Sequence, residues 1–146
     1  MKPCPICNSS REPQAKKTTY ALGDVSVEVQ ERGLYCRTCD QLTLAPGAME
    51  ESEKRIARAL IDAGVTSGPA FRHIRKAANF KAKEIAELLG TTPETVSRWE
   101  NGQRDIPRPV MALTAAVALE RMSGERGDLR ARLERYGQEP AKRLSA

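Results

Sequence analysis

The chain has 146 residues, enough for one medium-sized domain or two small ones. It contains neither an apolar run long enough to span a membrane nor a secretory leader pattern, so we expect a soluble, cytoplasmic protein. Residues 1–67 hold nine Lys/Arg and nine Asp/Glu, whereas residues 68–146 hold fifteen and ten, so the net charge of +5 lies entirely in the second part. A basic second part favours binding to a polyanion such as DNA.

All four cysteines lie in the first forty residues, as two C-x-x-C pairs: Cys4 with Cys7, and Cys36 with Cys39. Each pair offers two thiolates at one tight turn, so the pattern predicts one structural Zn²⁺ per chain. A disulfide is disfavoured because cytoplasmic thiols stay reduced, and a thioredoxin-like motif lacks its βαβ context. A catalytic zinc needs an open position, and the only histidine, His73, lies in the other half, where we expect a partly exposed helix residue.

The residues between the two cysteine pairs predict a β-hairpin. Lys16–Leu22 and Val25–Gln30 read as strands around the turn signal Gly23-Asp24, with valines alternating with polar residues in the second strand. A third strand at Gly33–Tyr35 would bring the second cysteine pair back to the first. We therefore expect a zinc-binding β domain at residues 1–46.

Residues 47–67 are expected to form a helix and a hinge between two domains. Met49–Ala63 has apolar residues at helical spacing, and Val65–Pro69 reads as the hinge, in which Ser67 caps the next helix. Because each half has its own apolar pattern, loss of the metal is expected to unfold the zinc domain and leave the helical half folded.

A helix-turn-helix is predicted within residues 74–104. Apolar residues at helical spacing end at Gly90, and glycine is typical just past a helix end. Thr92 can cap the second helix, Pro93 suits its first position, and the helix is expected to end at Glu100. This arrangement lays the second helix in the major groove of DNA.

The run E-I-A-E-L-L-G-T-T-P-E-T-V-S-R-W-E-N-G is similar to the helix-turn-helix of the Cro and phage-repressor family. In that family an arginine of the preceding helix pairs with the glutamate that ends the recognition helix. The resemblance assigns these roles to Arg75 and Glu100. The alternative is an ordinary helical hairpin in some other all-α domain.

The recognition helix is expected to run from Pro93 to Glu100 and to expose Glu94, Thr95, Ser97 and Arg98. Arginine reads guanine through two parallel hydrogen bonds, and glutamate can accept from the cytosine amino group. Glu94 has an alternative role, since with Thr91 as cap it would close a capping box. Further cations lie near helix ends where phosphates would pass: Lys81, Lys83, Arg104 and Arg108.

Beyond the motif, residues 110–119 are apolar apart from Thr114, so this helix must be covered on more than one side. A second copy of the chain is the natural cover, which predicts a homodimer on a palindromic operator. Asp128–Tyr136 reads as a last helix, and the tail from Gln138 is expected to be frayed. We assign residues 68–146 to DNA binding and dimerisation, in an α+β protein.

The combination of the two modules resembles the MqsA (YgiT-type) antitoxins, on the segments M-K-P-C-P-I-C, R-G-L-Y-C-R-T-C, I-R-K and S-R-W-E within residues 1–110. In these bacterial proteins the zinc is structural, the N-terminal domain binds a ribonuclease toxin, and the C-terminal domain dimerises and represses its own operon. The chain has Asn8 and Asp40 where the family often has glycine. It has Ala82 for a common glutamine and Glu94 for a base-contacting asparagine.

The sequence thus predicts a sequence-specific DNA-binding repressor, the antitoxin of a type II toxin–antitoxin system. Two alternatives remain open at this point: a free-standing helix-turn-helix regulator without a toxin, and a protein-interaction module that no longer reads DNA. An enzyme is not expected, because the sequence has no histidine or carboxylate cluster and no nucleophile–base pair.

Overall fold

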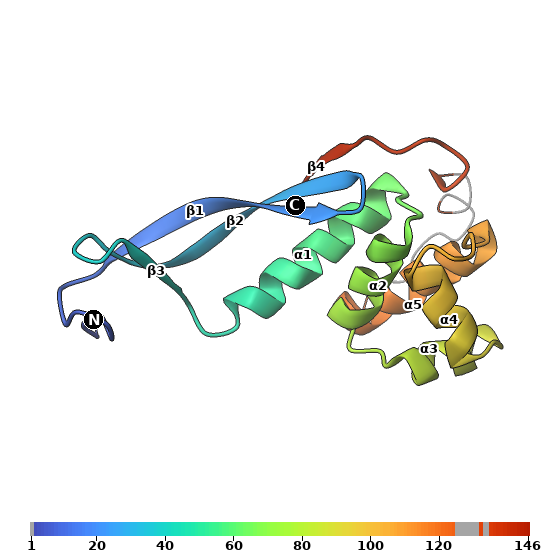
Figure 1. The fold of residues 1–146 in the computed structure, drawn as a ribbon, viewed down its shortest axis with the longest axis horizontal. Coiled ribbons are helices and arrows are strands. Elements are labelled where there is room, and N and C mark those ends of the chain that lie inside the picture. The colour runs from blue at the N-terminus through green and yellow to red at the C-terminus, as the bar shows by residue number, and fades with distance from the viewer. Residues whose placement is uncertain (1, 125–131, 133–134) are drawn as a thin grey trace.

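A long antiparallel β-hairpin lies beside a group of helices in the computed structural model of the chain, which describes residues 2–124, 132 and 135–146 (Figure 1). The hairpin consists of β1 (Glu12–Leu22) and β2 (Val25–Cys36), paired along their whole length from Leu22↔Val25 to Glu12↔Tyr35. The N-terminal end of the chain lies at the far end of the hairpin from the helices (Figure 1). The predicted α+β class is confirmed.

The inward face of β2 forms the sheet's part of the core. Val25, Val27 and Val29 are buried, and the fourth inward residue, Glu31, is also buried. Its carboxylate accepts hydrogen bonds from the hydroxyls of Tyr20 and Thr18, the latter at 3.0 Å, so the buried charge has partners. The bond to Glu31 and the burial of the phenol raise the pKa of Tyr20 to about 12.

The third strand is not where the sequence predicted it. Gly33–Tyr35 belongs to β2, which is six residues longer than expected, and the separate strand β3 is Gln41–Leu44, after the second cysteine pair. β3 pairs with β2 from Gly33↔Leu44 to Cys36↔Gln41. A Cβ on Gly33 would collide with the carbonyl oxygen of Thr43, so the glycine permits the close approach of the two strands.

Helix α1 (Ala48–Ala63) packs against both β2 and α2 (Gly68–Ala77). Ile56, Leu60 and Ile61 are fully buried between them, and one continuous apolar cluster includes the valines of β2 and the core of the helices. The segment expected to act as a linker is thus a packed element. The expected hinge is packed as well, because Val65 is buried. The domain boundaries themselves stay a prediction.

The remaining helices are α3 (Ala82–Leu89), α4 (Pro93–Glu100) and α5 (Arg108–Ser123), and α2, α3 and α4 all lie at the end of the molecule away from the N-terminus (Figure 1). Helix α5 contacts α2 and α3, and buries Met111, Ala115 and Leu119 completely or almost completely. None of the helices in the described parts of the chain has the length and apolar content needed to cross a bilayer.

The C-terminal tail is ordered, so the expectation of a frayed tail from Gln138 is wrong. Strand β4 (Arg143–Ser145) pairs in parallel with β2, with Leu144 opposite Val27, and the Ala146 amide donates to the Glu28 carbonyl. Its side chains carry no strand pattern of their own, and the pairing depends on an edge of β2 more than a hundred residues away in the chain. The helix predicted at Asp128–Tyr136 lies mostly outside the described residues.

Candidate metal centre and nucleic-acid interface

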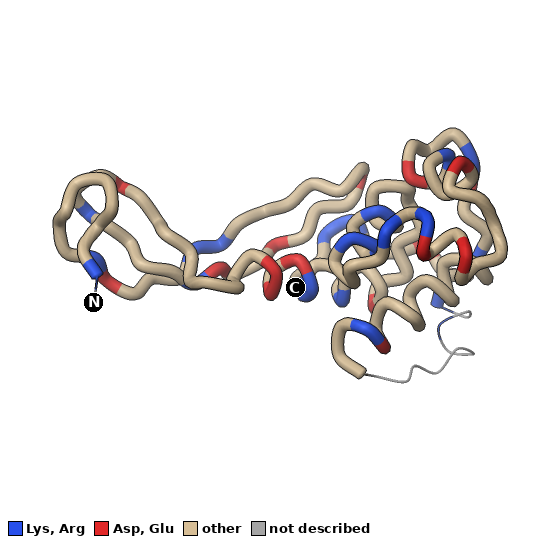
Figure 2. The backbone as a smooth tube through the Cα atoms, turned by 90° about the horizontal axis from the view of Figure 1, so that it is seen from below, with Lys and Arg blue, Asp and Glu red and all other residues tan. Residues whose placement is uncertain are grey.

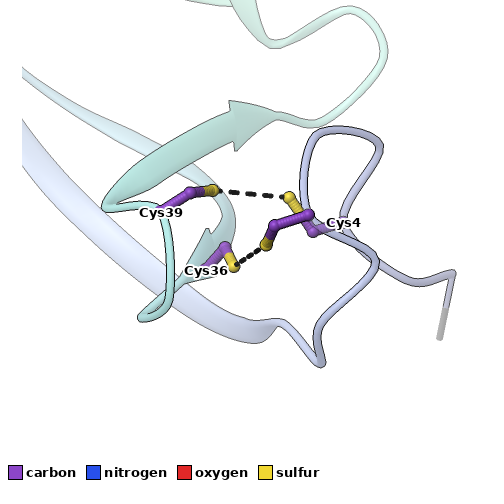
Figure 3. A group of neighbouring side chains, drawn as sticks. Cys4, Cys36 and Cys39 are labelled. Atoms are coloured by element: carbon purple, nitrogen blue, oxygen red, sulfur yellow. Dashed lines mark hydrogen bonds between the residues drawn. The ribbon is translucent and has the colours of Figure 1, made fainter.

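The four cysteines meet at the N-terminal end of the hairpin. Cys4 and Cys7 lie in the loop before β1, Cys36 ends β2, and Cys39 lies in the turn before β3. All four sulfurs lie within 4.8 Å of one another, with 3.6 Å between Cys4 and Cys39 and 3.4 Å between Cys7 and Cys36. Figure 3 shows Cys36, at the end of β2, and Cys39, in the turn before β3, facing the loop that carries Cys4.

The local backbone explains how each pair turns so tightly. Asn8 and Asp40, each directly after a cysteine pair, have φ angles of 59° and 55°. This left-handed region favours glycine and is tolerated by Asn and Asp. The Asn8 amide donates to the Cys4 carbonyl and the Cys4 amide donates to the Ser9 carbonyl, both at 2.9 Å. Asn8 and Asp40 therefore take the left-handed conformation that a glycine at the same positions would also allow.

This arrangement fits a metal held by four thiolates. Metal–sulfur bonds of about 2.3 Å in a tetrahedron place the sulfurs about 3.8 Å apart, close to the separations here, whereas a disulfide requires about 2 Å. Hydrogen bonds from the hydroxyl and amide of Ser9 lower the pKa of Cys7 to about 6, and the amides of Cys7 and Ile6 lower the pKa of Cys4. Burial raises the pKa of Cys39 to about 12, a cost that a bound cation would offset. The four cysteines are therefore placed to hold a metal ion.

At the other end of the molecule, α3, a tight turn and α4 form the predicted helix-turn-helix. Gly90 ends α3 in a left-handed conformation, with a φ angle of 67°. The Thr91 amide then donates a hydrogen bond to the Ala86 carbonyl at 2.9 Å. The Thr92 hydroxyl then accepts from the Thr95 amide at 3.2 Å and caps α4, and Pro93 occupies the first helical position. Each of these steps follows from the local sequence.

One face of α4 is fixed against α2. Val96 and Trp99 are buried, and the Trp99 ring meets Phe71 edge to face with centroids 6.0 Å apart. A Cβ on Gly68, the first residue of α2, would lie 2.5 Å from the carbonyl oxygens of Trp99 and Glu100. The opposite face of α4 is therefore the one available to a ligand.

That outer face carries the residues predicted to contact bases. Glu94, Ser97 and Arg98 are exposed, and Thr95 is half-buried. The Thr95 hydroxyl lies 3.0 Å from that of Thr92, and Ser97 accepts from the Asn101 side chain at 3.3 Å, so both hydroxyls have local partners. Within the described part of the chain, the charged groups of Glu94 and Arg98 have none.

The capping-box role considered for Glu94 is wrong, because the cap is Thr92 and the third helical position is then Thr95. Glu94 lies in the first turn of α4, where the helix dipole favours a negative charge. Its carboxylate remains free to face a ligand.

The cations predicted to contact phosphates are exposed around the motif: Lys81, Lys83, Arg104 and Arg108. Lys81 stands just before α3, and its amide donates to Glu84 at 3.4 Å. The Arg108 guanidinium lies against Gly137 of the C-terminal segment, which sequence reasoning did not anticipate. Figure 2 shows Lys and Arg repeatedly along the helical part of the chain, interspersed with Asp and Glu.

Arg75 and Glu100 form a buried ion pair beneath α4. The arginine donates to both carboxylate oxygens, with its Nη2 at 3.2 Å, and both side chains are about nine-tenths buried. Its Nη1 donates at 2.9 Å to the Phe80 carbonyl, in the loop before α3. One guanidinium thus joins α2, the start of the motif and the end of α4.

Sequence reasoning missed a second cation that supports the motif. Arg121 of α5 lies 4.3 Å from the centroid of the Phe80 ring and 3.5 Å from the Glu84 carboxylate. It thereby connects α5 to α3 across 37 residues of sequence, and no local pattern marks such a contact.

We expect Arg75→Ala to lower the stability of the helical part by about 3–5 kcal/mol, because it leaves the Glu100 carboxylate buried without a cation. The double variant Arg75→Leu/Glu100→Leu removes both charges and should recover much of that loss. Thermal unfolding of the three proteins measures the difference. Equal melting temperatures for wild type and Arg75→Ala would show that the pair does not hold α4 in place.

Comparison with known proteins adds one positive finding. Residues 71–121, from α2 through most of α5, match the helix-turn-helix family model, of the Cro/C1 type. No curated protein and no solved structure shows significant similarity to the chain. The matched span contains the motif, the Arg75–Glu100 pair and the Arg121 contact. Residues 71–121 therefore form a helix-turn-helix domain, which supports DNA binding and a role in transcription regulation.

Proposed function

We propose that the protein is a dimeric, sequence-specific repressor that reads a palindromic operator through α4. The observation that carries this proposal is the division of α4 into a fixed inner face and an outer face on which Glu94 and Arg98 have no partner in the described part of the chain. Because the helix is already fixed, contact with a base edge requires ordering of the side chain alone and not of the backbone that carries it. The surplus of positive charge in residues 68–146 supports attraction to the duplex.

The proposed dimer interface is the outer stripe of α5. Val110, Leu113 and Val117 recur at helical spacing; Leu113 is 46 % exposed, and Val110 and Val117 are partly buried at the border of the core. Pairing these stripes about a two-fold axis would remove apolar surface from water. It would also let the two copies of α4 lie about 34 Å apart, one turn of DNA.

We further propose that the metal at the cysteine cluster is Zn²⁺, one per chain, with a structural role. Four thiolates close the coordination sphere and leave no position for a substrate, and they suit zinc among the abundant divalent ions. In this proposal neither end of the molecule is an enzyme.

The antitoxin role is the most specific part of the proposal. It rests on the likeness of the paired modules to the MqsA family, which implies that the zinc-binding end neutralises a ribonuclease toxin while the helical end represses the operon. A free-standing regulator with the same DNA chemistry is the alternative. Co-expression with the product of an adjacent gene distinguishes them, because only an antitoxin should form a stable complex that blocks RNA cleavage.

Purified protein is expected to contain one zinc per chain, and Cys7→Ser or Cys36→Ser to lose most of it. The core joins β2 to α1. Metal removal should therefore increase amide exchange only in the cysteine loops and β3, whereas the sequence alone predicts that the whole β domain unfolds. Metal analysis and amide hydrogen exchange with and without a chelator measure both effects. Much less than one zinc per chain with four free thiols would exclude the site.

Arg98→Ala should cost on the order of 1–3 kcal/mol at the operator and little on random DNA, since its guanidinium is assigned to a base edge. Lys83→Ala is the matched control, because it removes the same charge from a phosphate contact. It should weaken both duplexes and reduce the salt slope by about one unit. Binding curves at three salt concentrations test this. Equal losses for Arg98→Ala on both duplexes would make Arg98 a phosphate contact.

The dimer is tested by sedimentation of the full-length chain at tens of micromolar. Wild type is expected to sediment as a dimer and Leu113→Asp as a monomer, because the substitution places a charge in the proposed apolar interface. Leu88→Asp is the control, since Leu88 is at least as exposed but lies on α3. A monomeric wild type, or equal dissociation by both variants, would exclude α5 as the interface.

A further inference from the structure

A groove of about 610 Å³ lies on the sheet near the cysteine cluster and contains none of the residues assigned above to the metal or to DNA. Its floor is apolar, formed chiefly by Leu34, Leu44 and Pro46. The alternation of β2, in which Val27, Val29 and Glu31 face the core, places Leu34 on the opposite face, away from α1. The groove is therefore separate from the core and from the surface that faces DNA.

Three cations surround this apolar floor: Lys2, Arg11 and Arg32. Arg11 donates from Nε and Nη2 to the carbonyl of Lys2, at 3.1 and 2.9 Å, which positions the guanidinium without neutralising it. None of the three has a carboxylate partner among the described residues, and no Asp or Glu lines the groove. On the same sheet Lys17 is paired with Glu28, 3.7 Å away, and it lies outside the groove.

We propose that the groove binds a small organic anion with an apolar body, such as a medium-chain carboxylic acid. The volume falls within the range of about 300–1,000 Å³ that is usual for small-molecule sites. An apolar floor favours the hydrocarbon part, and the cations favour the carboxylate, whose charge-assisted hydrogen bonds to arginine are the strong kind. A volume of this size suits a compact ligand better than an extended peptide added along the edge of β3.

A ligand bound here would add a second binding surface to the proposed regulator. The proposal that the groove binds an anion rests only on the groove, so it can be tested independently of DNA binding. The proposal is tested on the zinc-loaded, full-length protein by titration with three probes below their micelle concentrations. Decanoate carries chain and carboxylate, decyltrimethylammonium carries a similar chain with the opposite charge, and acetate carries the carboxylate alone.

Decanoate is expected to give saturable amide shifts at Gly33, Leu44 and Ala45 in nitrogen-15 spectra, with the other two probes at least about tenfold weaker. Arg32→Ala should weaken decanoate binding by about tenfold, the usual size of one charge-assisted contact. Lys17→Ala removes the same charge from the same sheet outside the groove and should leave binding unchanged. Both residues are exposed, so neither change should disturb folding, and zinc content checks this.

Three results would overturn the proposal. Equal binding of decanoate and decyltrimethylammonium would show a site without charge selectivity. Equal effects of Arg32→Ala and Lys17→Ala would place the anion elsewhere. Saturation of the same amides by an acidic, apolar peptide, with no response to decanoate, would make the groove a protein-docking surface.

Discussion

The position of the recognition helix depends on the ion pair between Arg75 and Glu100. A buried charge pair contributes little net stability, but each partner is costly to leave alone, so the pair acts mainly to specify one arrangement. Because the same guanidinium also holds the Phe80 carbonyl, it fixes the entry to α3 and the end of α4 together. The close approach of Gly68 to the end of α4 and the packing of Trp99 on Phe71 then leave α4 only one free face. The surface that we propose reads DNA is the side that these contacts do not use.

Helix α1 extends this constraint to the other end of the molecule. It packs on α2 with one side and on the valines of β2 with another, so the sheet and the helical part share a single apolar core. The C-terminal strand adds a second connection, since β4 returns from the helical part to pair with β2. The candidate metal centre lies beyond this core, at the far end of the hairpin. There the chain is organised by four cysteines and by two residues, Asn8 and Asp40, in the left-handed backbone conformation.

The parts of the fold that were predictable are those with local causes. Gly90, Thr92 and Pro93 set the motif turn because each acts on backbone groups within four residues of itself. Each C-x-x-C pair is local in the same sense, but the two pairs form one cluster only because the hairpin brings Cys36 and Cys39 back to Cys4 and Cys7. Asn8 and Asp40 looked like departures from a family pattern, yet their φ angles show that they perform the same turn as glycine. Glu94 does not close a capping box because the cap of α4 is Thr92 and not Thr91. Both residues carry a hydroxyl that can cap a helix, so the sequence alone does not decide between them.

The parts that were not predictable depend on distant contacts. β3 is only four residues long, and its position is set by pairing with β2 beside Gly33. β4 has no strand pattern and forms because an edge of β2 is available. Glu31 occupies an apolar position in the alternation of β2 because Tyr20 and Thr18, on the neighbouring strand, supply its hydrogen bonds. The groove on the sheet is likewise assembled from the segment before β1, the C-terminal part of β2, and β3 with the two residues after it, so no single stretch of sequence reveals it.

We propose that two copies of α4 read DNA from one face of a two-fold dimer. Hydroxyl-radical footprinting of the DNA upstream of the gene, with zinc-loaded full-length protein, tests DNA reading and dimer symmetry at once. Two protected half-sites related by a dyad are expected, with centres about one helical turn apart, and both should be lost when a shuffled sequence is used. Uniform protection of any duplex, or no protection under conditions where the protein is folded, would contradict it.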